Sequence, residues 1–183
     1  MNGHTLIEKA TELAMHAHDG QLRKEAALPY IVHPIEVALI LARHGFSDTV
    51  VAAALVHDVV EDSPVTTDDV RRELGGEVAA LVAQITHDDS LSWDEKKKAY
   101  VESVRVASNE VKAISIADKI ANARSLIAAA NEQGAAVWRH FSRGRDKKIW
   151  FEELMLEMFR KDWHHQMVEE YAQLIEQMKM LAY

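Results

Sequence analysis

Residues 48–62 read DTVVAAALVHDVVED and give the clearest indication of the kind of fold that the chain adopts. Apolar residues recur there at a spacing of three or four, which is the period of an α-helix with a buried face. Asp48 suits the start of such a helix, because its carboxylate can accept hydrogen bonds from backbone N–H groups of the first turn. The stretch therefore predicts one buried helix over residues 48–62.

The same period continues through the rest of the chain. There are only 7 glycines and 3 prolines among 183 residues, and so few breakers favour helices. Ser92 and Glu95 have the spacing of a capping box, and no alternating pattern indicates a strand. We expect an all-α bundle of roughly eight to ten helices. The predicted ranges are 5–18, 35–44, 48–62, 67–74, 76–86, 92–107, 109–131, 147–160 and 166–181.

The charge balance limits the class of ligand. The chain has 21 Lys plus Arg against 29 Asp plus Glu, so its formal net charge is −8 at pH 7. A nucleic-acid polymer needs a basic surface that displaces counterions, and this excess of acid argues against one as a partner. A small anion needs only a few local cations and is compatible with the composition.

The chain has no cysteine, which excludes disulfides, thiolate nucleophiles and cysteine-rich zinc sites. The first residues lack the basic and apolar regions of a leader, and no uncharged segment reaches a membrane-spanning length. We expect one domain over residues 1–183, in the cytoplasm and without a membrane partner. The apolar face of residues 166–181 either completes the core or forms a contact in a homo-oligomer.

Three carboxylates and one imidazole share one side of the predicted 48–62 helix. At about 100° per residue, Glu61 lies about 40° round the helix from His57. Asp58 and Asp62 lie about 100° and 140° from it. Carboxylates buried together without a cation repel one another and lose hydration, and a divalent metal removes this cost. The alternative is a solvated helix end, which is disfavoured because the helix dipole is negative there.

Further candidate ligands lie in two other segments. His33 precedes Pro34 at a predicted helix start, where a lone histidine is more often a surface or capping residue. Asp118 lies in the middle of an apolar helix face, although aspartate has poor helix propensity. Asn122 and Ser125 follow it on the same face. Two imidazoles and two carboxylates suit Mn²⁺, Fe²⁺ or Zn²⁺ with coordination positions open for water.

The order of these residues resembles the metal signature of the HD phosphohydrolase superfamily. Within it, the chain is similar to the hydrolase domain of RelA/SpoT-type alarmone enzymes and to stand-alone hydrolases of the metazoan SpoT-homologue type. The matching segments are QLRK (21–24), PYIVHP (29–34), HDVVED (57–62), ITHDDSL (85–91) and ADKIAN (117–122). Several motifs in the right order are far more specific than any one of them. The resemblance covers about residues 5–130 and implies an HD-domain helical bundle.

The resemblance also implies a role for each matching residue. Four residues would hold a metal, usually Mn²⁺ in this family: His33, His57, Asp58 and Asp118. Glu61 and Asp62 would orient the attacking water and accept its proton. Four more would line the nucleotide pocket: Arg23 and Lys24 near the base, and Asn122 and Ser125 against the nucleoside. The reaction removes the 3′-pyrophosphate from guanosine 3′,5′-bis(diphosphate) (ppGpp) or its pentaphosphate analogue, giving GDP or GTP and pyrophosphate.

Two basic segments supply candidate phosphate contacts. A lysine run such as 96–98 is usually a solvated helix face, and Lys97 is the member that we expect to contact substrate phosphate. The segment 138–148 is the most basic part of the chain. It either closes over a polyphosphate or forms a basic turn that packs Trp138 and Phe141 inward.

Three features depart from the family pattern, and one of them is that residues 26–28 (AAL) lack the glycine often found after the Arg-Lys pair. Ser115 stands where relatives often have lysine, and His87 stands where they often have aspartate. These departures motivate one alternative, an HD phosphohydrolase that acts on another nucleotide phosphate. A second alternative is a non-catalytic alarmone-binding sensor, although a sensor has little need of a water-activating pair.

Overall fold

The computed structural model describes residues 5–24, 28–84 and 92–182. The described helices are α1 (Leu6–Ala17), α2 (Val32–Arg43), α3 (Asp48–Leu55), α4 (Val59–Asp62), α5 (Thr67–Leu74), α6 (Gly76–Ala83), α7 (Trp93–Val106), α8 (Asn109–Gln133), a 3₁₀ helix η1 (Gly134–His140), α9 (Gly144–Asp162) and α10 (Gln166–Met180). Within these ranges there is no strand, only an isolated antiparallel bridge between Leu22 and Pro29. The all-α prediction is confirmed.

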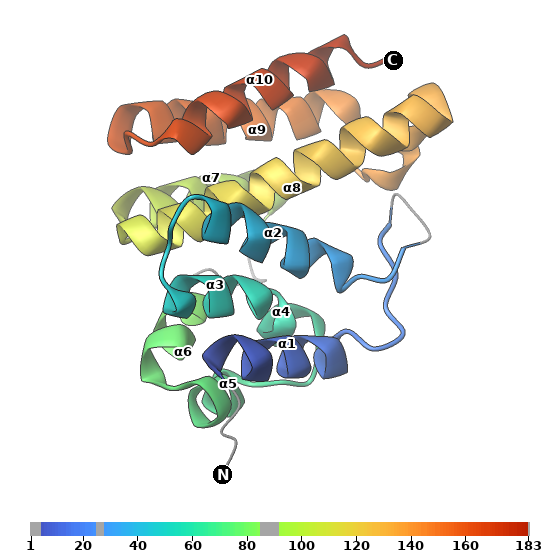
Figure 1. The fold of residues 1–183 in the computed structure, drawn as a ribbon. Coiled ribbons are helices and arrows are strands. Elements are labelled where there is room, and N and C mark those ends of the chain that lie inside the picture. The colour runs from blue at the N-terminus through green and yellow to red at the C-terminus, as the bar shows by residue number, and fades with distance from the viewer. Residues whose placement is uncertain (1–4, 25–27, 85–91, 183) are drawn as a thin grey trace.

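The long helix α8 organises the layers (Figure 1). Helices α9 and α10 cover one side of α8, and α2 packs on the other side. Helix α3 lies beneath α2, followed by α1 and the α5–α6 pair. Residues 111–117 of α8 are all buried, because this part of the helix is covered around its whole circumference. A polar side chain on this part of α8 therefore faces a packed neighbour and not water.

Helix α2 begins three residues earlier than predicted, at Val32. Pro34 is accommodated in its first turn, where the missing backbone N–H has no helical partner to lose. His33 consequently lies in the first turn of the helix, and only 3% of its surface is exposed, so it is not a surface histidine. The early start thus turns this histidine into the interior of the bundle.

The prediction of one helix over residues 48–62 is wrong, because the chain breaks between α3 and α4. The ring nitrogen Nδ1 of His57 lies 2.8 Å from the carbonyl oxygen of Ala54. In a continuous α-helix that carbonyl would accept from the N–H of Asp58. The His57 imidazole replaces the Asp58 N–H as the partner of this carbonyl. The backbone tightens there, because the N–H groups of Val56 and Val59 donate to the carbonyls of Ala53 and Val56, each at 3.3 Å. His57 and Asp58 therefore lie in a turn, and the angles calculated for a regular helix do not apply to them.

The other helix predictions agree with the structure to within three residues. The Ser92–Glu95 capping box is present at the start of α7. The predicted end of the 76–86 helix lies outside the described residues. Among the helices described, none is both long enough and apolar enough to cross a membrane.

Two leucines of α2 form a matched pair for testing the core. Leu41 is fully buried, whereas Leu39 is 57% exposed on the same helix. Leu41→Ala is expected to lower the free energy of unfolding by about 2–5 kcal/mol, because it leaves a cavity in a packed interior. Leu39→Ala should change it by less than about 0.5 kcal/mol. Urea denaturation followed by circular dichroism measures both, and equal losses for the two variants would contradict this packing.

Candidate active site

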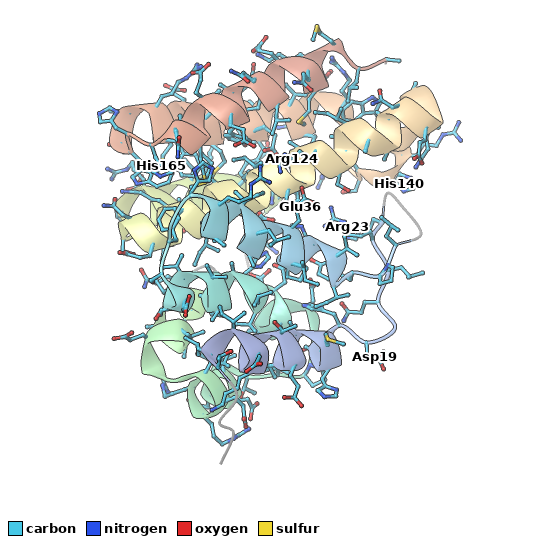
Figure 2. The ribbon with its side chains drawn as sticks, in the orientation of Figure 1. Asp19, Arg23, Glu36, Arg124, His140 and His165 are labelled. Atoms are coloured by element: carbon cyan, nitrogen blue, oxygen red, sulfur yellow. The ribbon has the colours of Figure 1, made fainter. Side chains whose placement is uncertain are left out.

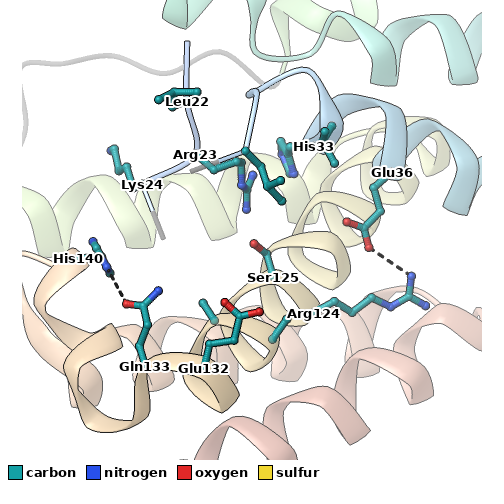
Figure 3. A pocket seen from close by; sticks show the side chains of 14 residues that line it. Leu22, Arg23, Lys24, His33, Glu36, Arg124, Ser125, Glu132, Gln133 and His140 are labelled. Atoms are coloured by element: carbon teal, nitrogen blue, oxygen red, sulfur yellow. Dashed lines mark hydrogen bonds and ion pairs between the residues drawn. The ribbon is translucent and has the colours of Figure 1, made fainter. Parts of the chain in front are cut away.

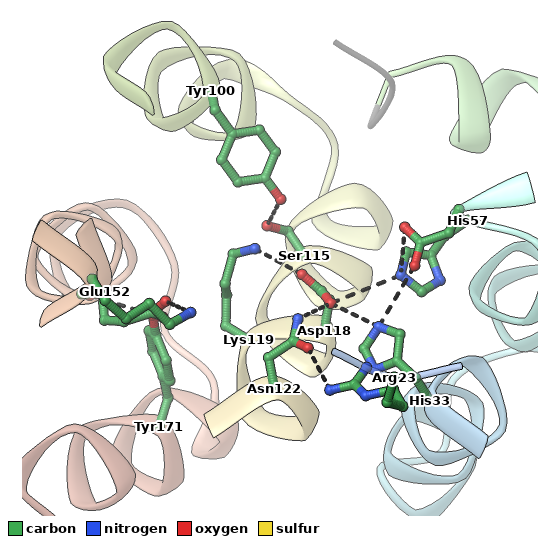
Figure 4. A network of polar contacts seen from close by, with 12 residues as sticks. Arg23, His33, His57, Tyr100, Ser115, Asp118, Lys119, Asn122, Glu152 and Tyr171 are labelled. Atoms are coloured by element: carbon green, nitrogen blue, oxygen red, sulfur yellow. Dashed lines mark hydrogen bonds and ion pairs between the residues drawn. The ribbon is translucent and has the colours of Figure 1, made fainter. Parts of the chain in front are cut away.

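Four predicted metal ligands from three segments meet between α2 and α8 (Figure 4). His33 comes from the first turn of α2, His57 and Asp58 from the α3–α4 turn, and Asp118 from the middle of α8. The Nε2 atom of His33 lies 3.1 Å from Asp118 Oδ1, and that of His57 lies 3.2 Å from Asp58 Oδ1. The cross pairs, His33 with Asp58 and His57 with Asp118, are 3.7 and 3.8 Å apart.

These separations fit a divalent first-row metal. Ligand atoms about 2.1 Å from one ion lie about 3.0–3.5 Å from each other, close to the distances seen here. The ligand atoms of His33, His57 and Asp58 all lie within 4.8 Å of one another. Because imidazole nitrogens and carboxylate oxygens are ligands that such ions accept, the donor set is chemically suitable.

The hydrogen-bond partners of the His57 ring also indicate a cation site at its Nε2 atom. Its Nδ1 faces a backbone carbonyl, which can only accept, so Nδ1 carries a proton. Its Nε2 is buried and has no hydrogen-bond donor among the described residues, although it faces two carboxylates. A nitrogen lone pair and carboxylate oxygens repel one another unless a proton or a metal lies between them. The site is therefore built for a positive charge.

Neighbouring side chains hold both carboxylates. The Tyr30 hydroxyl donates to Asp58 Oδ2 at 2.6 Å. Asn122 Nδ2 donates to Asp118 Oδ1 at 2.6 Å, and Lys119 Nζ donates to Asp118 Oδ2 at 2.7 Å. Such partners fix the orientation of metal ligands. Asn122 thus contacts Asp118 directly, one turn along α8 as the spacing predicted.

The charges of the site shift two pKa values in opposite senses. Burial by itself would raise the pKa of Asp118, but the Lys119 ammonium and the two imidazoles outweigh it and hold this pKa well below its usual range. Burial by itself would lower the pKa of His57, but the carboxylates of Asp58 and Asp118 outweigh it and raise this pKa to about 9. Without a metal, His57 is therefore a protonated imidazolium at neutral pH.

The two predicted water-activating acids lie on the short helix α4, next to the ligand cluster. Glu61 and Asp62 are both exposed at its surface. Burial of part of its carboxylate and the nearby charge of Asp58 raise the pKa of Asp62, while the neighbouring Tyr30 hydroxyl opposes the rise. A carboxylate with a raised pKa is a better proton acceptor.

A cavity of about 910 Å³ opens beside the cluster, between α8 and the segment that links α1 to α2 (Figure 3). Arg23 and Lys24 line one side of it, and Ser125 lines the other, as Figure 3 shows. Arg23 also donates to Asn122 Oδ1 at 3.1 Å, which ties the linking segment to α8. Arg23 and His140 lie on the same side of the molecule in Figure 2.

A second, smaller cavity of about 370 Å³ is strongly cationic. Its lining includes Lys24, Lys97, Lys119, Arg143 and Lys148, together with Phe151. The Lys97 ammonium lies 4.6 Å from the centre of the Phe151 ring. Burial, followed by the charges of Lys119 and Lys148, lowers the pKa of Lys97 to about 8. This concentration of positive charge suits a phosphate group.

The two ends of the basic 138–148 segment have different surroundings. Trp138 is buried, and its indole N–H donates to the Ala182 carbonyl at 2.8 Å. Arg143 and Lys148 line the cationic cavity. One end of the segment therefore packs inward, and the other supplies cations to the cavity.

A buried carboxylate beside Lys148 was not predicted from the sequence. Glu152 on α9 is only 1% exposed and is paired with Lys148 Nζ at 2.5 Å and with the Tyr171 hydroxyl of α10 (Figure 4). A buried charge needs such partners. The Lys148–Glu152 spacing of one helical turn was a visible signal, whereas the contact with Tyr171 was not.

The departure at Ser115 does not leave the region without a cation. Its hydroxyl pairs with the buried Tyr100 hydroxyl at 2.7 Å. One turn later, the Lys119 ammonium lies 5.1 Å from the centre of the Tyr100 ring. The departure at His87, the rest of the 85–91 motif and residues 26–27 lie outside the described residues.

The chain is similar to known proteins in sequence and in structure. The HD domain family matches residues 10–146. The mouse (Mus musculus) guanosine-3′,5′-bis(diphosphate) 3′-pyrophosphohydrolase MESH1 is 42% identical over 121 residues, which cover 64% of this chain and 68% of the relative. The bifunctional (p)ppGpp synthase/hydrolase SpoT of Escherichia coli K12 is 38% identical over 126 residues, which cover 66% of this chain but 18% of that longer protein.

A solved structure extends the similarity over nearly the whole chain. It is that of a metazoan ortholog of SpoT described as hydrolysing ppGpp, and it is 27% identical. It superposes with a TM-score of 0.80 and covers 97% of each chain.

The raised pKa of His57 predicts that metal binding depends on pH. Because a metal must displace the proton on Nε2, its affinity should fall about tenfold for each pH unit below about 9. At pH 7, binding of Mn²⁺ should release about one proton from His57. Calorimetry in two buffers of different ionisation enthalpy measures the released protons. An affinity that is constant between pH 6.5 and 8 would contradict the assigned charge state.

Proposed function

The chain belongs to the HD-domain family, and from this premise we propose that it hydrolyses guanosine 3′,5′-bis(diphosphate), or its pentaphosphate analogue, at the 3′-pyrophosphate. The products are GDP or GTP and pyrophosphate. The observation that carries the proposal is the cluster of His33, His57, Asp58 and Asp118, whose ligand atoms face one another beside a cavity large enough for a nucleotide. Residues 1–183 would act as one hydrolase domain, since α8 packs against both α2 and α10.

The four clustered residues would hold the divalent metal, and we propose Mn²⁺. When bound, such an ion supplies a water of lowered pKa and polarises phosphoryl oxygens. The chain's own part is to fix the ligands. Tyr30 orients Asp58, and Asn122 with Lys119 orients Asp118.

Asp62 would accept the proton of the attacking water, with Glu61 beside it to orient that water. The raised pKa of Asp62 supports this role, because proton transfer to a carboxylate is easier when its conjugate acid is weaker. The water oxygen forms a bond to the phosphorus next to the ribose 3′-oxygen, and the bond from that phosphorus to the 3′-oxygen breaks. The 3′-oxygen then receives a proton and leaves as the hydroxyl of GDP.

The nucleoside would occupy the larger cavity. Arg23 offers a planar guanidinium for a purine, and Ser125 offers a polar group from α8. Asn122 lines an adjoining cavity that Arg23 and Lys24 also line, and it accepts from Arg23 there. The phosphates would meet the cations of the smaller cavity, including Lys97, because Lys24 lines both cavities. One small anion needs only the local cations of this cavity, so the proposal is compatible with a net charge of −8.

We place the enzyme in the cytoplasm, with a small nucleotide as its partner. The acidic composition argues against a nucleic-acid polymer. The buried residues of α10, such as Tyr171 and Ile175, support the role of this helix in completing the core. A homo-oligomer would then have to use another surface.

A nucleotide panel tests the proposed reaction. With Mn²⁺, the protein should convert ppGpp to GDP and pyrophosphate. Asp58→Ala should lose at least about 100-fold in kcat, because a metal ligand is gone. Asp68→Ala, the same change at an 86% exposed position, should retain full activity. Higher kcat/KM for another nucleotide would favour the alternative substrate, and tight ppGpp binding without turnover would favour a sensor.

The lowered pKa of Lys97 predicts how binding responds to pH. Lysine is charged below its pKa, so the cavity should lose positive charge as the pH rises through about 8. The Kd of GDP should therefore increase between pH 7.5 and 9, measured by calorimetry. Lys97→Met should bind GDP more weakly at pH 7.5 and show a flatter pH dependence. An unchanged pH dependence in this variant would contradict the assignment of Lys97.

A further inference from the structure

The end of helix α4 is held by a residue from a distant part of the chain. This helix has only 4 residues, Val59–Asp62, and its own closing bond runs from the Asp62 N–H to the Asp58 carbonyl at 2.9 Å. The carbonyl oxygen of Asp62 accepts a hydrogen bond of 2.8 Å from the side-chain amide of Gln21, which is 41 residues earlier. One turn has few hydrogen bonds to offset the loss of backbone entropy. The Ser63 hydroxyl caps the helix locally by donating to the Val59 carbonyl at 2.6 Å, and Gln21 adds a contact from outside the helix.

The hydrogen bonds of Gln21 determine the orientation of its amide. The amide nitrogen faces two backbone carbonyls, those of Asp62 and, at 3.5 Å, Ala17. Carbonyls only accept, so this end must be the NH₂ group. The amide oxygen then faces His18 Nδ1 at 2.9 Å, and Nδ1 must be the donor. The two carbonyls and the His18 N–H therefore all select the same orientation of the Gln21 amide, with its NH₂ group toward Asp62.

His18 is itself held rigidly. It is 3% exposed, and its ring lies 4.7 Å from that of Tyr30, centre to centre. Its Nε2 is buried without a hydrogen-bond partner among the described residues, so the bond to Gln21 orients the ring. The backbone of Gln21 is fixed as well, since its N–H donates to the His18 carbonyl at 3.1 Å and its carbonyl accepts from Tyr30 N–H at 2.9 Å.

We propose that Gln21, oriented by His18, is a positioning residue for Asp62. Its amide fixes the backbone at the end of α4, so that the Asp62 carboxylate stays aimed at the attacking water. This inference rests on the proposed function, because it assigns to Asp62 the proton-accepting role. Neither Gln21 nor His18 is a proposed ligand of the metal, so both act through Asp62. A displacement of about 1 Å at a reacting group can reduce the rate about 100-fold.

The first test separates kcat from KM. Gln21→Met keeps the length of the side chain but removes the donor to Asp62. The expected result is a kcat at least about tenfold lower, with KM for ppGpp within about twofold, because Arg23 and Lys24 still line the nucleotide cavity. Gln84→Met is the matched control, since the Gln84 amide also donates to a backbone carbonyl, that of Ala80, but at the end of α6. It should leave kcat unchanged.

The second test uses rescue at position 18. His18→Leu removes the donor that orients Gln21 and should lower kcat as Gln21→Met does. His18→Asn restores an N–H near the place of Nδ1 and should return kcat to within about threefold of the wild type. A purely structural role of His18 predicts no such rescue. Thermal unfolding of each variant shows whether it is folded at the assay temperature.

If Gln21→Met does not fold, Gln21→Glu replaces it, because the carboxylate keeps the acceptor for His18 but cannot donate to Asp62. An unchanged kcat in a folded Gln21 variant would overturn the proposal, and so would a KM that rises as much as kcat falls. A His18→Asn variant as impaired as His18→Leu would also overturn it. Failure of the wild type to hydrolyse ppGpp would instead contradict the proposed function, so the two failures are distinguishable.

Discussion

The structure depends on one electrostatic constraint. Between α2 and α8, imidazole nitrogens and carboxylate oxygens face one another with little exposure to water. The Nδ1–H of His57 is committed to the Ala54 carbonyl, so its Nε2 presents a lone pair to the carboxylates of Asp58 and Asp118. Such an arrangement is stable only around a positive charge. A proton meets the requirement in the metal-free protein, and a divalent ion meets it when bound. Tyr30 and Lys119 donate to the Oδ2 atoms of these carboxylates and so hold both side chains in place.

The fold brings the four residues together from three segments: α2, the α3–α4 turn and α8. Helix α8 is covered on both sides, so Asp118 is held within the bundle, and the early start of α2 turns His33 toward it. The break between α3 and α4 then places His57 and Asp58 opposite these two residues. Because the break leaves α4 short, its end needs support from elsewhere, and the Gln21 amide supplies it. The turn that carries His57 and Asp58 is thus stabilised by the segment between α1 and α2, which also carries Arg23 and Tyr30.

The sequence predicted the helical period, the capping box at Ser92 and the residue types that could bind a metal. Each of these depends on residues close together in the chain. The break at His57 was not, because it arises when a side chain replaces a backbone N–H as the partner of a carbonyl, and apolar spacing carries no sign of this exchange. The pairing of Glu152 with Tyr171 and of Gln21 with Asp62 was hidden for another reason. These contacts join residues far apart in the chain, and only the packing of α10 on α9 and of α1 near α4 brings them together.

The central claim is that His33, His57, Asp58 and Asp118 surround a single divalent cation. Anomalous diffraction from crystals grown with Mn²⁺ tests it most directly, because the signal locates the ion independently of activity. One strong peak is expected, enclosed by the two Nε2 atoms and one oxygen from each carboxylate. A peak elsewhere in the molecule, or no peak at this position in crystals that contain Mn²⁺, would contradict it.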